Sequence, residues 1–205
     1  MRKLFTILVA TTIFLSCKSE AKKDDDKSKE EVKKSTAAFS VANAKNDINF
    51  TAYKTTEKVA VGGEFTEINI TSGGEGNTIK EAMNGAVFSI PINSLATKDT
   101  SRDYKIQKFF FGVMTNTKTL TGYLTIKDDT NGVAKLTMNN ETKDVPFTYT
   151  IKGNTFNMQA TIDINTWNAG AALASLNKIC EVLHAGADGV SKTWSDVALN
   201  ITSTF

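Results

Sequence analysis

Histidine, cysteine and proline are scarce in this 205-residue chain, which contains one His, two Cys and two Pro. Zinc and similar metals are normally held by several His and Cys side chains, so the scarcity argues against such a centre. Two cysteines also cannot build the disulfide framework of a small secreted domain. No Ser-His-acid or Cys-His arrangement stands out. We therefore expect no catalytic residue, no metal ligand and no cofactor.

A surplus of positive charge is missing as well. Residues 36–205 carry 15 basic and 16 acidic side chains. A nucleic-acid-binding protein needs a concentrated basic face to neutralise phosphates. The near-neutral charge of this region predicts that nucleic acid is not a partner.

The apolar run at 4–16 is too short for a membrane-spanning helix. It has roughly a dozen apolar residues, whereas a bilayer core needs about 20. Arg2 and Lys3 precede the run and Ser16-Cys17 follow it, so the segment resembles a bacterial lipoprotein signal. The resemblance implies a signal peptide at 1–16, removed before an acylated Cys17 that attaches the chain to a membrane. It places the protein in the bacterial cell envelope, in the periplasm or on the outer-membrane surface.

Residues 17–38 combine this cysteine with a charged, low-complexity segment. The stretch from 18 to 35 alternates short runs of Lys with runs of Asp and Glu. Such a segment has too little apolar surface to build a core, so we interpret it as a flexible tether. The folded part is then expected to span 39–205.

From residue 39 onward, apolar and polar side chains alternate with a period of two, which is typical of half-buried strands. Seven such runs are present, at 48–52, 88–92, 120–126, 134–138, 145–151, 156–164 and 197–201, and we expect about eight strands in all. Asn131-Gly132 is a typical hairpin dipeptide. Spacing by three and four predicts an amphipathic helix over 171–184 and a shorter helical turn at 78–84. Strands without interleaved helices indicate an antiparallel barrel or a sandwich.

The order and spacing of three groups of residues are similar to those of the YceI-like family of secreted lipid-binding proteins, in its Bacteroidetes-type branch. The groups are FTAYK at 50–54 with VGGEF at 61–65; INSLAT at 92–97 with Arg102-Asp103 and FFF at 109–111; and Leu176, Cys180 and His184 with KTWSDV at 192–197. The resemblance implies an all-β fold, an extended lipocalin-like eight-stranded antiparallel β-barrel with one C-terminal amphipathic helix. It also implies a long-chain, isoprenoid-type lipid ligand inside the barrel.

The inward-facing apolar residues are the candidates for lining such a ligand, although any of them could instead pack against a neighbour. They are Phe50, Phe65, Phe88, Ile90, Ile92, Leu120, Leu124, Phe147, Phe156, Met158 and Ile162. Arg102 and Asp103 are expected either to pair with each other or to brace a loop at the barrel mouth, with contact to a lipid headgroup as the alternative. Cys180 lies on the apolar stripe of the predicted helix, which indicates a buried, unreactive thiol.

Three functions remain open at this level. A hollow barrel would store, sequester or transport a lipid. A solid barrel would be a tethered structural or protein-interaction domain without a ligand. An envelope enzyme has the least support, because no cluster of titratable residues is apparent. The sequence leaves open both the hollowness of the barrel and the formation of a homodimer.

Overall fold

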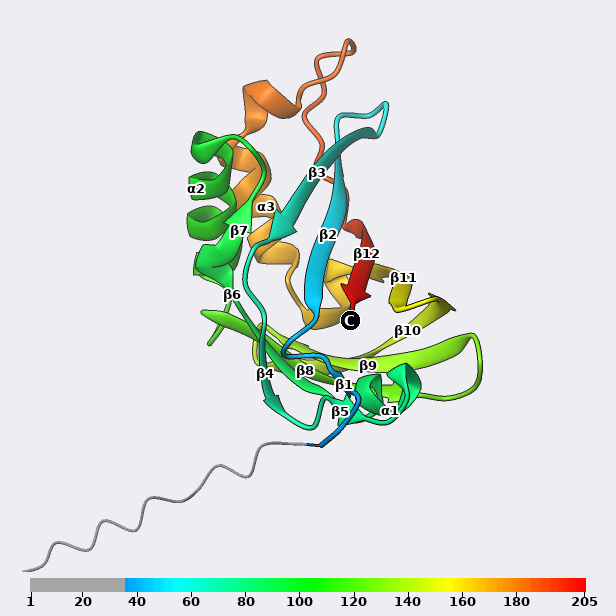
Figure 1. Cartoon of the computed structure of the whole chain (residues 1–205). Coiled ribbons are helices and arrows are strands. Elements are labelled where there is room, and N and C mark those ends of the chain that lie inside the picture. The colour runs from blue at the N-terminus through cyan, green and yellow to red at the C-terminus, as the bar shows by residue number, and fades with distance from the viewer. Residues whose placement is uncertain (1–35) are drawn as a thin grey trace, which may run out of the picture. The chain divides into compact units, whose positions relative to one another are not determined.

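The computed structural model describes residues 36–205 (Figure 1). The predicted signal peptide, Cys17 and the predicted tether before residue 36 lie outside the described residues. The strands are β1 (Phe39–Ser40), β2 (Lys45–Lys54), β3 (Val59–Phe65), β4 (Asn69–Ser72), β5 (Glu75–Gly76), β6 (Val87–Pro91), β7 (Leu95–Ala96), β8 (Thr119–Ile126), β9 (Asn131–Met138), β10 (Glu141–Lys152), β11 (Thr155–Asp163) and β12 (Asp196–Thr204). The helices are α1 (Ile79–Met83), α2 (Thr100–Phe109) and α3 (Gly170–Ile179), with 3-10 helices η1 (Ile92–Ser94), η2 (Phe111–Val113), η3 (Ile164–Trp167) and η4 (Glu181–His184).

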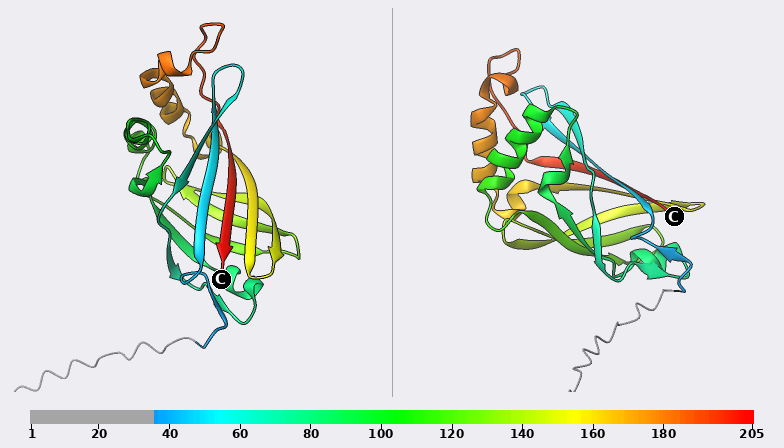
Figure 2. Two further views of the ribbon diagram at one scale, coloured as in Figure 1. Left: turned by 45° about the horizontal axis from the view of Figure 1, so that its top comes forward. Right: turned by 60° about the vertical axis from the view of Figure 1, so that its left-hand side comes forward.

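Ten strands form one antiparallel sheet in the order β4-β6-β8-β9-β10-β11-β12-β2-β3-β7. The sheet curls so that one face surrounds an interior (Figure 2). β6 pairs with β8 near one end of this order, and β7 pairs with β3 at the other. Residues 87–96 pass through β6, η1 and β7, so one bent stretch of chain bridges both ends of the sheet. The fold is therefore mostly β and barrel-like.

Each of the seven predicted runs forms a strand, and VGGEF at 61–65 lies in β3, but the predicted count of eight does not match the ten-stranded sheet. The two additional strands are β4 and β7, with four and two residues. Strands this short cannot display an alternation of period two, which is the signal that identified the others. The pairing of β11 with β12 and of β12 with β2 runs without a bulge over their full contact.

The prediction of a single C-terminal helix is incomplete, since the described chain contains three α-helices. α3 is the predicted helix, but it ends at Ile179, and η4 continues to His184. α1 occupies the predicted helical turn. α2 was not predicted, because its sequence is mainly polar and none of its residues is buried. The Asp99 side chain caps α2 by accepting a hydrogen bond from the backbone N–H of Arg102 at 3.0 Å.

The hairpin between β8 and β9 turns at residues 127–130, not at Asn131-Gly132 as predicted. The Asp128 carboxylate accepts hydrogen bonds from the backbone N–H groups of Thr130 and Asn131, both at 2.8 Å. This local capping fixes the turn before the dipeptide is reached, and Asn131 already belongs to β9. The next hairpin, between β10 and β11, turns at Gly153, which has a φ of 56°.

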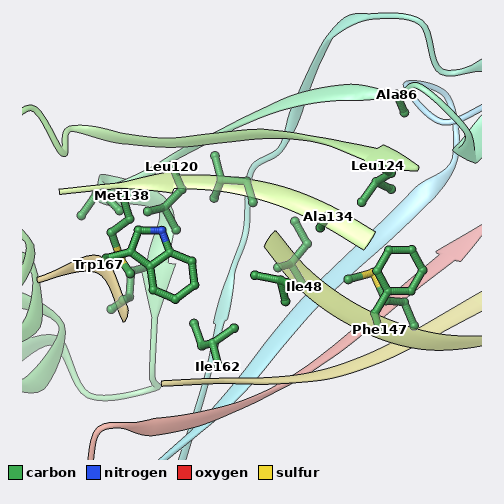
Figure 3. Packing of buried hydrophobic residues seen from close by; sticks show 14 of the residues in the cluster. Ile48, Ala86, Leu120, Leu124, Ala134, Met138, Phe147, Ile162 and Trp167 are labelled. Carbon is green, nitrogen blue, oxygen red and sulfur yellow. The ribbon is translucent and has the colours of Figure 1, made fainter. Parts of the chain in front are cut away.

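The main hydrophobic core lies on the inner face of the sheet, where side chains from facing strands meet (Figure 3). The labelled residues that point into this interior include Ile48, Leu120, Leu124, Ala134, Met138 and Ile162. Trp167 is 2% exposed and its indole N–H donates a hydrogen bond to the carbonyl oxygen of Leu136 at 3.0 Å. That bond ties η3 to β9 and satisfies the one polar atom of a buried ring.

Candidate functional site

The interior of the curled sheet contains a cavity of about 210 Å³. Apart from Asn46, Thr193 and Ser203, its wall consists of aliphatic and aromatic residues and methionines. For comparison, an engineered apolar cavity of about 150 Å³ stays dry and binds benzene. The cavity is thus large enough to take up apolar groups and has almost nothing to offer a polar solute.

The cavity extends along the strands. Asn46 on β2 pairs with Ser203 on β12 near one end of the wall. At the other end, Thr193 forms a bridge with Lys54, eight residues further along β2. A strand rises about 3.4 Å per residue, so the wall is about 27 Å long. A narrow apolar space of this length fits an extended hydrocarbon chain better than a compact ligand.

Several inward-facing side chains remain partly accessible. Phe50, Phe65 and Phe88 are half-buried, although each belongs to the inner face of its strand. Because these residues lie on the cavity wall, part of their apolar surface borders the hollow. Apolar surface left exposed in this way is the surface that a bound hydrocarbon would cover, at about 25 cal/mol per Å².

The structure places eight of the eleven predicted lining residues on this wall. They are Phe50, Phe65, Phe88, Ile90, Leu120, Leu124, Met158 and Ile162. Ile92, Phe147 and Phe156 are buried in the same core but are not on the wall. Whether any of them contacts a ligand stays a prediction.

The three residues away from the wall have specific packing roles. Ile92 opens η1, where the chain leaves strand geometry. The ring of Phe147 covers Gly132 on the neighbouring strand. Phe156 stacks on Tyr149 with the ring centres 4.9 Å apart. Alternation in the sequence identifies the inner face, but it does not distinguish residues that fill the interior from residues that surround the hollow.

The helices contribute wall residues that were not among the predicted lining set. α2 and α3 contact each other and lie side by side over one end of the barrel (Figure 2). Ile106 and Phe110 reach the wall from the α2 region, and Leu173 and Leu176 reach it from α3. The three-and-four spacing in α3 was a usable signal, since it showed that Leu173 and Leu176 share one buried face. No comparable signal exists in α2.

Arg102 and Asp103 brace the connection between β7 and α2 instead of lining the cavity. The Arg102 guanidinium donates to the Thr97 hydroxyl at 2.8 Å and to the Thr97 carbonyl at 2.5 Å. The Asp103 carboxylate accepts hydrogen bonds from the hydroxyl of Thr97 and, at 2.8 Å, from its backbone N–H. Both side chains are therefore used in holding Thr97, which favours the structural interpretation over headgroup contact.

A small polar cluster near α3 is centred on the wall residue Thr193. The Thr193 hydroxyl donates to the side-chain oxygen of Asn177 at 2.8 Å. Nδ1 of His184 lies 2.6 Å from the same hydroxyl, which leaves the hydroxyl oxygen to accept from the imidazole N–H. Burial, and then the nearby positive charge of Lys54, lowers the pKa of His184. The imidazole is therefore held neutral near pH 7.

Cys180 is 5% exposed, and burial raises the pKa of its thiol. A reactive cysteine needs an accessible, low-pKa thiolate, so this position does not fit a nucleophile. Among residues 36–205 no group of three or more His, Cys, Asp or Glu side chains is arranged to hold a metal ion. Within the same range, no helix has the length and apolar character needed to cross a bilayer.

Comparison with known proteins agrees with the fold. Residues 39–205 match the YceI-like domain. The chain belongs to the YceI-like family. No curated protein sequence matches it significantly.

Solved structures extend the comparison to three dimensions. A polyisoprenoid-binding domain from Saccharophagus degradans, implicated in plant cell wall breakdown, superimposes with a TM-score of 0.56 at 15% identity; the alignment covers 82% of this chain and 97% of that one. BcnA of Burkholderia cenocepacia gives 0.49 at 17% identity over 78% and 96% of the two chains. A Campylobacter jejuni YceI protein gives 0.47 at 18% identity over 68% and 81%. The TM-score of the Saccharophagus degradans domain, at 15% identity, shows a shared fold and nothing beyond it.

Proposed function

We propose that this YceI-like protein is an envelope lipoprotein that binds an isoprenoid or similar long-chain amphiphile in the interior of its barrel. The observation that carries the proposal is the apolar cavity, about 210 Å³ in volume and lined along the strands by aliphatic and aromatic side chains. A ligand of this class matches the name of the Saccharophagus degradans domain. The fold needs no catalytic group for such a role, and the proposal is for a binding protein and not an enzyme.

The energetics favour a long tail. Each methylene that leaves water for an apolar site contributes about 0.8 kcal/mol. A tail with about ten such groups in the cavity would gain about 8 kcal/mol, which offsets the cost of immobilising one small molecule. The membrane anchor in this proposal is Cys17, and its support is the sequence pattern at 1–17. Storage, sequestration or transport would all use the same cavity.

The test is organic extraction of the purified full chain, followed by mass spectrometry of the extract. Leu199 and Ala198 are neighbours on β12, and only the Leu199 side chain faces the hollow, because the inward residues of β12 alternate. Leu199→Trp should fill part of the cavity and reduce the co-purified lipid by about tenfold, equivalent to about 1.4 kcal/mol. Ala198→Trp adds the same ring to the outer face and should leave the lipid content unchanged.

Two results would contradict the proposal. One is an empty protein after expression in a bacterial envelope, which would support the tethered interaction domain. The other is an equal loss of lipid in both variants, since the loss would then not depend on the cavity.

A further inference from the structure

Exposed aliphatic side chains gather at one end of the barrel. Nine large hydrophobic residues are exposed within residues 36–205, and four of them lie between 179 and 190. These four are Ile179 at 45%, Val182 at 89%, Leu183 at 57% and Val190 at 51% exposure. We call them the apical surface. Val182 is more exposed than any other large hydrophobic residue of this set, although the surrounding chain is well ordered by hydrogen bonds.

The apical surface is held in place by contacts to the body. The backbone N–H of Gly186 donates a hydrogen bond to the carbonyl oxygen of Val190 at 3.2 Å, which folds the loop after η4 back on itself. The backbone N–H of Thr55 donates a hydrogen bond to the carbonyl oxygen of Lys192 at 2.9 Å, and the Thr56 hydroxyl donates to the Asp188 carboxylate at 2.8 Å. The turn between β2 and β3 thus supports the loop, and the aliphatic groups are presented outward by a fixed scaffold.

Aromatic rings and lysines adjoin the apical surface. Nζ of Lys192 lies 3.6 Å from the ring centre of Trp194. Nζ of Lys58 lies 4.9 Å from the ring centres of both Tyr53 and Trp194. Trp, Tyr and Lys are the side chains that settle at the headgroup level of a bilayer, since each has an apolar body and a polar or charged end.

This end of the molecule is also an end of the cavity. Trp194 and Thr193 belong both to the segment that follows the apical surface and to the cavity wall. Leu176, one helical turn before Ile179 on α3, lines the wall as well. An apolar ligand that leaves the hollow at this end would pass directly beside the exposed aliphatic residues.

We propose that the apical surface docks onto a phospholipid bilayer, with Val182 and Leu183 inserted among the acyl chains. The inference rests on the proposed function in one respect: docking would bring the cavity to the membrane that supplies its lipid ligand. A bilayer fits because the four exposed side chains lie at a helix end and in a loop that extends beyond the strands (Figure 1), and a bilayer surface needs no complementary pocket. Interfacial binding of this kind scales with the apolar area that enters the bilayer.

The experiment places an environment-sensitive nitrobenzoxadiazole label on Val182→Cys in the full chain, reconstituted in phosphatidylethanolamine and phosphatidylglycerol vesicles. Ile151→Cys is the matched control. Ile151 is also exposed, but it lies far from the apical surface. It pairs with Phe156 on β11, whereas Asp163, seven residues further along β11, lies at the apical end. Seven residues of strand separate the two positions by about 23 Å. The unsubstituted chain, treated in the same way, gives the background labelling.

We expect the emission of the label at 182 to shift to shorter wavelength and to be quenched by doxyl-labelled acyl chains, while the label at 151 stays water-exposed. A second label, on Val190→Cys, should lose at least about tenfold of its membrane signal when Val182→Asp and Leu183→Asp are introduced. Equal signals at 182 and 151, or an unchanged signal at 190 in the double variant, would overturn the docking proposal.

Lipid extraction of the double variant separates the two proposals. Retained cavity lipid with lost insertion supports docking and leaves the proposed function intact. Insertion at 182 in a protein that never contains lipid would support docking and refute the proposed function. Circular dichroism confirms folding, which we expect to be preserved because both substituted side chains are largely in solvent.

Discussion

Two glycines inside strands make room for aromatic rings that pack over the sheet. A Cβ atom at Gly132 would collide with the ring of Phe147. A Cβ atom at Gly122 on β8 would meet the carbonyl oxygen of Lys135 and, at 2.7 Å, the ring of Phe88. Phe88 is on the cavity wall, so the absence of a side chain at Gly122 allows the Phe88 ring to occupy its position beside the hollow.

We therefore expect Gly122→Ala to destabilise the protein by about 1–3 kcal/mol, because the strand must move away from a backbone neighbour. Gly62→Ala on β3 is the matched control. Its nearest neighbour to the new Cβ would be the Phe50 carbonyl at 4.0 Å, an ordinary contact. The free energy of unfolding, measured by urea denaturation, should fall for the first variant and stay within about 1 kcal/mol for the second. Similar losses in both would show that packing at 122 is not the cause.

At the scale of elements, α3 and η4 are joined through polar groups to the segment that precedes β12. His184 in η4 and Asn177 in α3 both bond to Thr193, and the ammonium of Lys54 on β2 donates to the carbonyl of Leu183 at 2.9 Å. These contacts hold the helix over the barrel end without any ion pair. A neutral His184 is part of this arrangement, so the joint should respond to acid.

The folded-state pKa of His184 is lowered below its usual value near 6.5. The unfolded chain therefore binds a proton first as the pH falls, and the stabilising contribution of the neutral ring is lost below about pH 6.5. The melting temperature should drop from pH 7.5 to pH 5.5 more in the native chain than in His184→Gln, whose amide can still reach Thr193. Calorimetry of both proteins at both pH values checks this, and an equal drop would exclude His184 as a source of acid sensitivity.

For the whole molecule, an apolar hollow makes stability depend on its occupant. A ligand that binds only the folded state adds about 2.7 kcal/mol at a hundredfold excess over its dissociation constant. For a protein of this size, this amounts to a rise of about 5–10 °C in melting temperature. Delipidated protein should therefore melt lower than protein that retains its lipid, as measured by differential scanning fluorimetry. The Leu199→Trp variant, with part of its cavity filled, should show a smaller difference, and an equal difference there would place the lipid elsewhere.

Much of the sheet follows from the sequence alone. The residues that alternate along 156–164 have only one way to hide their apolar sides, so Phe156, Met158 and Ile162 had to share one face. The same reasoning predicted α3 from the spacing of Leu173 and Leu176. It did not predict α2, which is stabilised by the Asp99 cap and by the bonds of Arg102 to Thr97. Polar contacts of this kind produce no periodic pattern of apolar residues in the sequence.

The sequence by itself determined which faces of the strands are apolar, the near-neutral charge of residues 36–205 and the lipoprotein-type pattern that ends at Cys17. Only the tertiary structure decided that Phe50 borders a hollow while Phe147 and Phe156 fill the core. The reason is that alternation is a property of one strand at a time. A cavity is a property of the distance between strands, which depends on how side chains from distant parts of the chain meet across the interior.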